Sequence, residues 1–254
     1  GLVEAKTSKT PMDQGFLKDT ADTKLLEDNT KYRSVVGAIL YIAVCARPDI
    51  MATATVLGRK VSAPTEKDWT AAKRAVRYFK DTKDWKLKMG GEHGVTDCGD
   101  LIAFSDADWA GDSSSRKSTT GYVVYFSGGA VSWASRKQSN VTLSTMEAEY
   151  VALAETCQEV LWLRRLLSDL GEVQHSATIV NGDNQACLSF ALSEKSSKRS
   201  KHIETKRHFI RDLCQRGDIK LRYCPTDSMN ADILTKSLGT VEHNMFAIRL
   251  GLMR

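Results

Sequence analysis

Residues 101–108 read Leu-Ile-Ala-Phe-Ser-Asp-Ala-Asp, an apolar run that ends in two carboxylates. Short apolar runs that contain branched and aromatic side chains are typical of buried strands. Two further β-rich runs follow at 119–126 and 130–135, and the Ser-Gly-Gly between them (127–129) is a hairpin signal. We therefore expect three consecutive antiparallel strands, with Asp106 near the end of the first.

The residues after this hairpin predict alternating helices and strands. A capping box, Ser-Thr-Met-Glu at 144–147, opens a helix that should run to about residue 170 and end at Gly171. We expect strands at 178–180 and 219–224, and helices at 184–192, 202–216 and 229–236. This order predicts an α/β fold with a mixed five-stranded sheet flanked by helices.

The residues before position 101 predict a small, mostly helical region. Apolar residues recur at helical spacing over 31–46 and 69–79, and two prolines separate the helices. Residues 1–30 are polar and lack periodicity, so we expect them to be extended or disordered. The glycine- and charge-rich stretch 90–100 is the best boundary in the chain, and it divides the chain into residues 1–95 and 96–254.

Composition excludes several classes of protein. Hydrophobic residues make up 42% of the 254 positions and charged residues 26%, which excludes collagen-like and wholly disordered chains. The longest apolar run, 35–46, is too short to span a bilayer, so no membrane partner is expected. Six scattered cysteines without a CxxC pair argue against a zinc site and predict the reduced thiols of a cytoplasmic or nuclear protein.

Four acidic positions stand at the ends of four predicted elements: Asp106, Asp183, Asp232 and one of the pair Glu147 and Glu149. Carboxylates gathered from separate elements repel each other, and hard divalent cations bound through oxygen relieve that repulsion. Two such ions about 4 Å apart can activate a water and stabilise the leaving oxygen of a phosphodiester. The alternative is that these acids are solvated surface charges, and their spacing alone does not decide between the two.

Two of the four positions have a neighbouring rival. Asp106 and Asp108 are two apart on a strand and point to the same side, so geometry leaves both open. Glu147 and Glu149 lie about 200° apart around a helix, so they cannot both face one site. Glu149 is about 60° from Met146 in the apolar stripe and Glu147 about 100° from it on the other flank, which favours Glu149 and keeps Glu147 as the alternative.

Motifs along most of the chain, from about Thr30 onward, resemble those of one family of mobile elements. They are YRSVVG at 32–37, ARPDI at 46–50, SDADWAGD at 105–112, RKSTTGY at 116–122, GAVSW at 129–133, EAEYVAL at 147–153, KHI at 201–203 and ADILTK at 231–236. In this order and spacing they are similar to the C-terminal part of Copia-type long-terminal-repeat retrotransposon Pol polyproteins.

The resemblance implies a reverse transcriptase connection region over 1–95 and a domain with the ribonuclease H-like fold over 96–254. It implies an enzyme that hydrolyses the RNA strand of RNA–DNA hybrids with two Mg²⁺ ions, for which Mn²⁺ could substitute. The implied partners are the hybrid and the upstream fingers and palm of the same polyprotein. The implied location is the cytoplasm, within virus-like particles, or the nucleus.

The family's motifs also select the catalytic and metal-binding residues. Its first acid directly follows an apolar strand, and its helical acid precedes a bulky apolar residue, which selects Asp106 and Glu149; Asp183 and Asp232 complete the implied set. Many ribonucleases H carry a histidine in the loop before the last acid, but residues 224–229 hold none. This departure puts the rate of the reaction in doubt more than its type.

Positive charge is concentrated in residues 195–222, where ten lysines and arginines stand against three acids, although the whole chain carries only +5. Such a run is often a solvated face, but this one lies between two of the acids and is rich in hydroxyl donors suited to phosphate oxygens. Smaller basic sets stand at strand ends. The residues we predict to bind nucleic acid are Arg116, Lys117, Ser118, Arg136, Lys137, Lys198, Arg199, Lys201, His202 and Arg207.

Two other functions fit the sequence less well. A degenerate copy that binds nucleic acid without cutting it would fit the missing histidine, but all four acids are retained. Polymerase activity is not expected, because the chain contains no paired-aspartate motif of the YxDD type.

Overall fold

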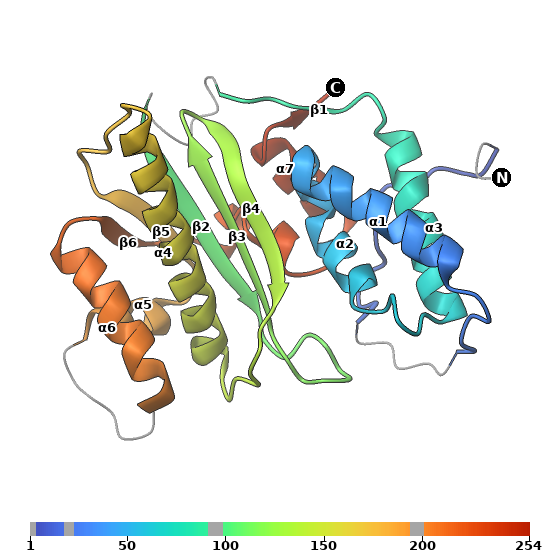
Figure 1. Ribbon diagram of the computed structural model, residues 1–254, viewed down its shortest axis with the longest axis horizontal. Coiled ribbons are helices and arrows are strands. Elements are labelled where there is room, and N and C mark those ends of the chain that lie inside the picture. The colour runs from blue at the N-terminus through green and yellow to red at the C-terminus, as the bar shows by residue number, and fades with distance from the viewer. Residues whose placement is uncertain (1–3, 18–22, 91–98, 194–200) are drawn as a thin grey trace.

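The computed structural model describes residues 4–17, 23–90, 99–193 and 201–254 (Figure 1). Its strands form a sheet with helices on both sides, and the N-terminal helices form a further region on one of these sides. The predicted boundary between residues 95 and 96 lies outside the described residues, so the division into two domains stays a prediction.

Five strands form one mixed sheet in the order β4-β3-β2-β5-β6. The first three strands in the chain pair antiparallel, whereas β5 pairs parallel with both β2 and β6. The mixed five-stranded sheet predicted from the sequence is therefore confirmed. The strands are β2 (Leu101–Asp108), β3 (Thr119–Phe126), β4 (Gly129–Lys137), β5 (Thr178–Gly182) and β6 (Ile219–Tyr223).

Strand β2 shows how the sequence builds two cores around this sheet. Leu101 and Ala103 point into a core on one face, and Ile102 and Phe104 point into a second core on the other. All four are buried, as the period of two along a strand requires when both faces are covered. The β3–β4 hairpin turns where predicted, because Ser127 and its neighbouring glycine hold φ of 48° and 79°.

Helices cover both faces of the sheet, with α4 and α6 on one side and α7 and the helical region on the other (Figure 1). The first face is covered by α4 (Thr145–Asp169), α5 (Gln185–Leu192) and α6 (Lys201–Gln215). The second face is covered by the single turn η4 (Asp232–Leu234) and by α7 (Thr240–Arg249), whereas the short turn η3 (Thr226–Ser228) contributes no buried residue.

The C-terminal part of the chain differs from the sequence prediction. The helix expected over 229–236 is reduced to the single turn η4, because Met229 adopts an extended conformation with ψ of 90° and the buried side chain of Asn230 donates a hydrogen bond to Tyr125 Oη at 3.2 Å. The helix α7 was not predicted. It packs Phe246 into the core beneath β2, which gives the C-terminal residues a place in the fold.

The helical region comprises α1 (Thr30–Cys45), η1 (Pro48–Ile50), α2 (Met51–Gly58) and α3 (Glu66–Asp81). It lies against the outer strand of the sheet. Trp133 Nε1 on β4 donates to the carbonyl of Ala43 at 2.9 Å, and Thr55 Oγ1 donates to the carbonyl of Ser135 at 3.0 Å. These contacts between distant segments hold the helices beside the sheet.

Both end segments of the described chain contact residues far from them in the sequence. Met12 is only 3% exposed, and the Arg74 guanidinium on α3 donates to Thr10 Oγ1 at 2.9 Å. The described residues 4–17 therefore follow an irregular path along the chain's own helices. Near the other end, β7 (Leu252–Met253) pairs antiparallel with β1 (Lys86–Leu87). None of the helices in the described ranges is long and apolar enough to cross a membrane.

Candidate metal centre

Three carboxylates from three elements meet at one end of the sheet. Asp106 comes from β2, Glu149 from the second turn of α4, and Asp183 from the residue that follows β5. One oxygen of each lies within 4.8 Å of the others. Asp106 is buried and the other two are half-buried, so the cluster lies at the edge of the core and is open to solvent on one side.

Asp232, the fourth predicted acid, lies on η4 and reaches this cluster through Thr235 and Lys236, the two residues that follow η4. Lys236 Nζ lies 3.0 Å from Asp232 Oδ2 and 3.9 Å from Asp106 Oδ2. Thr235 Oγ1 donates a hydrogen bond to Asp106 Oδ2. The other oxygen of Asp232, Oδ1, is buried and has no hydrogen-bond partner among the described residues.

A glycine on the neighbouring strand allows the segment after η4 to come this close. Gly121 pairs with Asp106 across β2 and β3. A Cβ at position 121 would lie 2.5 Å from Thr235 Cγ2 and 2.9 Å from Leu234 Cβ. Any larger residue at Gly121 would therefore push Thr235 away from Asp106.

The environment of Glu149, Asp183 and Asp232 disfavours the charged forms of these three side chains. Burial raises the pKa of Glu149 well above its usual range, and the negative charges of Asp106 and Asp183 raise it further. Burial and the charge of Asp106 likewise raise the pKa values of Asp183 and Asp232. Burial alone would lower the pKa of the Lys236 ammonium, but the carboxylates of Asp106 and Asp232 outweigh it and raise that pKa to about 12.

The donor set fits a divalent cation. Mutually repelling carboxylate oxygens within 4.8 Å of one another are the ligands that hard cations prefer. The unpartnered buried oxygen of Asp232 is a further position to which a cation or its bound water could attach. Lys236 is the one basic side chain paired with these acids among the described residues, and a single ammonium cannot balance four carboxylates.

Glu147, the rival of Glu149, has another role. The Glu147 carboxylate accepts a hydrogen bond from the backbone N–H of Leu143 at 2.8 Å, and its own N–H donates to Ser144 Oγ at 3.2 Å. Glu147 therefore supports the start of α4, although its carboxylate bonds the residue before the N-cap and not the N-cap itself. The Asp108 carboxylate packs against Gly111, where it leaves no room for a side chain.

The residues predicted to bind nucleic acid differ in where the structure places them. Arg116 and Arg136 are exposed. Ser118 was wrongly included, because it is fully buried and its hydroxyl pairs with Thr142 Oγ1 at 2.8 Å. Lys198 and Arg199 lie outside the described residues, and Lys201, His202 and Arg207 lie on α6 without a described side chain.

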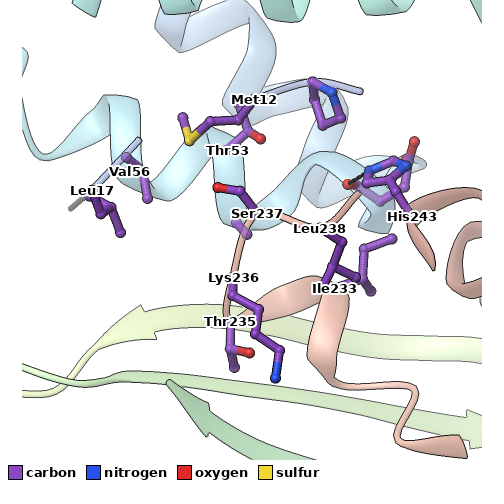
Figure 2. A pocket seen from close by; sticks show the side chains of 13 residues that line it. Met12, Leu17, Thr53, Val56, Ile233, Thr235, Lys236, Ser237, Leu238 and His243 are labelled. Atoms are coloured by element: carbon purple, nitrogen blue, oxygen red, sulfur yellow. Dashed lines mark hydrogen bonds between the residues drawn. The ribbon is translucent and has the colours of Figure 1, made fainter. Parts of the chain in front are cut away.

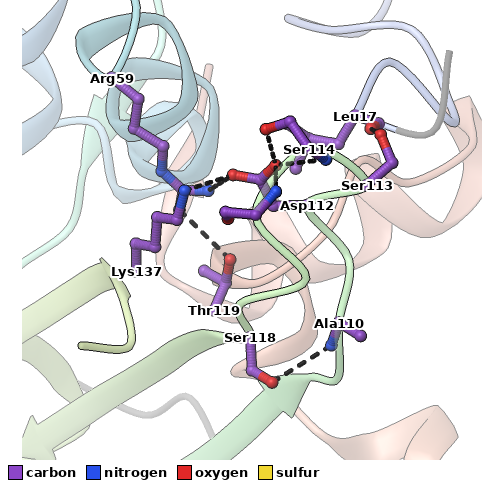
Figure 3. A network of polar contacts seen from close by, with 10 residues as sticks. Leu17, Arg59, Ala110, Asp112, Ser113, Ser114, Ser118, Thr119 and Lys137 are labelled. Atoms are coloured by element: carbon purple, nitrogen blue, oxygen red, sulfur yellow. Dashed lines mark hydrogen bonds and ion pairs between the residues drawn. The ribbon is translucent and has the colours of Figure 1, made fainter. Parts of the chain in front are cut away.

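Lys137 and its neighbours form a polar network that the sequence did not reveal (Figure 3). Lys137 Nζ binds Asp112 Oδ2 at 2.6 Å, and the guanidinium of Arg59, the residue after α2, lies 3.8 Å from the same oxygen. Burial alone would raise the pKa of Asp112, but the hydrogen bonds from Lys137 and Ser114 outweigh it and hold that pKa well below its usual range. The network ties the β2–β3 loop, which contains the half-buried Lys117, to the helical region.

Two residues beside the acids were also missed as site residues. Thr235 and Lys236 lie three and four positions after Asp232, a spacing that places side chains on one face of a helical turn. That spacing was visible in the sequence motif. Their approach to Asp106, which precedes Thr235 by 129 residues, was not.

Comparison with known proteins places the chain. No family model matches it. The chain is 37% identical over 254 residues, covering 97% of its length, to the retrovirus-related Pol polyprotein from transposon TNT 1-94 of Nicotiana tabacum. It is 34% identical over 253 residues, covering its whole length, to the corresponding polyprotein from transposon RE2 of Arabidopsis thaliana. The chain belongs to the Copia-type retrotransposon Pol family.

The chain spans 18% and 17% of the length of these two Pol polyproteins. It is also 46% identical over 135 residues to secreted RxLR effector protein 161 of Plasmopara viticola. This match covers 53% of this chain and 92% of the effector protein. The chain also matches a solved structure of LC11-RNase H1, isolated from compost, at 17% identity and a TM-score of 0.42. This match covers 54% of this chain and 93% of the LC11-RNase H1 chain. In this Pol family member, the strand order and flanking helices agree with the predicted ribonuclease H-like fold.

Proposed function

We propose that this part of the Pol polyprotein is an endoribonuclease that hydrolyses the RNA strand of RNA–DNA hybrids during reverse transcription of the element. The observation that carries the proposal is the approach of Asp106, Glu149 and Asp183 to within 4.8 Å from three separate elements. Reverse transcription of an RNA copy produces a hybrid whose RNA strand must be removed. Membership in the Pol family supports the hybrid as the substrate.

The cofactors of the proposed reaction are two Mg²⁺ ions, for which Mn²⁺ can substitute. Bound at this site, such ions supply an activated water and stabilise the oxygen that leaves phosphorus. The chain's own residues keep the acids in place: Thr235 donates to Asp106, and Thr226 Oγ1 donates to Asp183 Oδ2 at 3.0 Å. The proposed ligands are Asp106, Glu149, Asp183 and Asp232.

The proposed substrate is recognised through its backbone. A nuclease that must cut any hybrid needs contacts to phosphates and to the 2′-hydroxyls of the RNA strand, and it needs none to base edges. Arg116 and Arg136 are exposed residues with guanidinium groups suited to phosphates, and the basic residues around position 200 are proposed for the same role. The proposed protein partner is the upstream fingers and palm of the same polyprotein, in virus-like particles in the cytoplasm or in the nucleus.

The test is cleavage of a hybrid whose RNA strand carries a 5′ label, with Mg²⁺ and with EDTA. The wild-type chain should cut the RNA strand only with the cation. Glu149→Gln should reduce the rate at least about a thousandfold, or about 4 kcal/mol of transition-state free energy, because it removes a cation ligand. Glu147→Gln is the matched control, because Glu147 lies about 200° around the helix from Glu149 and supports the start of α4.

The folded fraction of each variant is measured by circular dichroism, so that lost activity is separated from lost structure. Glu147→Gln should cut at the wild-type rate once corrected for that fraction. Equal cleavage by the wild type and Glu149→Gln, or no cleavage by any of the three proteins, would contradict the proposal.

A further inference from the structure

Lys236 lies closest to the predicted cation ligands among the described basic residues. It follows η4 and extends toward the strands of the sheet, on the side of its segment opposite the helical region (Figure 2). Its ammonium lies 3.0 Å from Asp232 Oδ2 and 3.9 Å from Asp106 Oδ2. No other ion pair among the described residues joins a cation to Asp106, Glu149, Asp183 or Asp232.

The position of Lys236 sets up a competition. A divalent cation held by Asp106 and Asp232 would take the oxygens that the ammonium now contacts. Two positive charges a few ångströms apart at a partly buried site repel each other, so the ammonium and the cation cannot both occupy these oxygens. The side chain of Lys236 is 36% exposed, so it has room to turn toward solvent.

We infer that Lys236 is a built-in counter-ion: its ammonium holds Asp106 and Asp232 together before a divalent cation binds, and it competes with that cation for their oxygens. Lys236 is therefore a positioning residue, which acts through the two aspartates. It stabilises the cation-free fold and lowers the affinity of the site. The inference rests on the proposed function only in taking these acids as cation ligands.

The contacts around Lys236 support this role over a merely structural one. Thr235, its neighbour, already anchors the segment by donating a hydrogen bond to Asp106. Gly121 has no side chain, which lets the segment pack closely against β3. Lys236 therefore adds a charge to a segment that is already anchored without it. A surface lysine in an ordinary ion pair, such as Lys9 with Asp81 at 2.9 Å, has no such set of unbalanced acids around it.

The experiment compares the wild type with Lys236→Met, Lys236→Arg and Lys9→Met. Thermal unfolding is followed in EDTA, and Mg²⁺ and Mn²⁺ binding is measured by calorimetry without nucleic acid. Lys236→Met should unfold at a lower temperature in EDTA, yet bind the cation about tenfold more tightly, because the competing charge is gone. Lys236→Arg should behave more like the wild type, and Lys9→Met should bind cations as the wild type does.

The combination of lower stability and tighter binding distinguishes this role from simple structural support, since a residue that only held the site in shape would weaken binding when removed. Equal or weaker cation binding by Lys236→Met would overturn the inference. If Lys236→Met fails to fold, Lys236→Gln replaces it in the same two measurements. A wild-type chain that binds no cation would overturn both the proposed function and this inference. A wild-type chain that binds the cation and cuts the hybrid, beside a Lys236→Met variant that binds the cation no more tightly, would overturn this inference alone.

Discussion

Two groups of buried charge in this chain differ in how completely they are paired. In the helical region, the Arg47 guanidinium donates to both oxygens of Asp49 at 2.9 and 2.8 Å, and Tyr78 Oη donates to the same carboxylate at 2.6 Å. Arg47 also donates to Thr82 Oγ1 at 2.8 Å. At the end of the sheet, four acids share one lysine, and a buried oxygen of Asp232 has no partner among the described residues.

This difference separates a structural charge from a functional one. A buried pair whose hydrogen bonds are all made is neutral as a unit and needs no ligand. A cluster of like charges keeps its repulsion in the folded state, and it persists because the rest of the fold is stable enough to hold it. The fold therefore tolerates the repulsion between the acids, and a bound cation would relieve that repulsion.

The largest expected effect on stability comes from breaking the complete pair. Asp49→Asn should lower the free energy of unfolding by about 3–5 kcal/mol, because it leaves the buried Arg47 charge without its partner. Denaturant unfolding measures this loss. The double variant Arg47→Met/Asp49→Leu should recover most of it, since it removes both charges together.

A loss below about 1 kcal/mol in Asp49→Asn would mean that the pair contributes no more than a surface ion pair does. In that case the statement that the Arg47–Asp49 pair is a structural charge, in contrast to the acids at the end of the sheet, would be wrong.

A smaller effect concerns pH and the contact between the paired region and α7. His243 donates through Nε2 to the carbonyl of Asp49 at 3.1 Å and packs edge-on against Tyr78 with ring centroids 5.3 Å apart. Burial lowers the pKa of His243, and the nearby Arg47 charge acts in the same direction against the opposing charge of Asp49. The unfolded chain therefore takes up a proton at a higher pH than the folded chain does.

The stability that His243 contributes is thus complete above its unfolded pKa of about 6.5 and is lost as pH falls below it. His243→Gln should be less stable at pH 8 and should lose less stability than the wild type between pH 7 and pH 5. Denaturant unfolding at the three pH values measures the two slopes. Parallel slopes would show that another group causes the pH dependence.

The sequence predicted much of the sheet and part of the site, for identifiable physical reasons. β2 and β3 have the predicted bounds because their apolar runs and the Ser-Gly-Gly turn are local signals. The angle around the helix favoured Glu149, and the structure places it beside Asp106 and Asp183. Local patterns were sufficient wherever one element determined the outcome.

The sequence did not reveal features that depend on distant segments coming together. Lys236 and Thr235 become part of the site only because Gly121 lets their segment approach Asp106. Ser118 belongs to a basic motif, yet it is buried where β3 begins, next to Thr142. The helix α7 depends on a core that β2, β3 and η4 complete, so its own sequence carries a weak signal.

The most direct test of the central claim is thermal unfolding of the wild type and Asp183→Asn, each in EDTA and in Mg²⁺ or Mn²⁺. The claim predicts that Asp183→Asn melts at a higher temperature than the wild type in EDTA, because one repelling charge is gone while Thr226 can still donate to the amide oxygen. It predicts that the cation raises the melting temperature of the wild type, with a gain of about 2.7 kcal/mol at one hundred times Kd. The variant should gain far less at the same cation concentration. A wild type that melts at the same temperature in EDTA and in millimolar cation, or a variant that is less stable than the wild type in EDTA, would contradict the claim that these acids are held for a divalent cation.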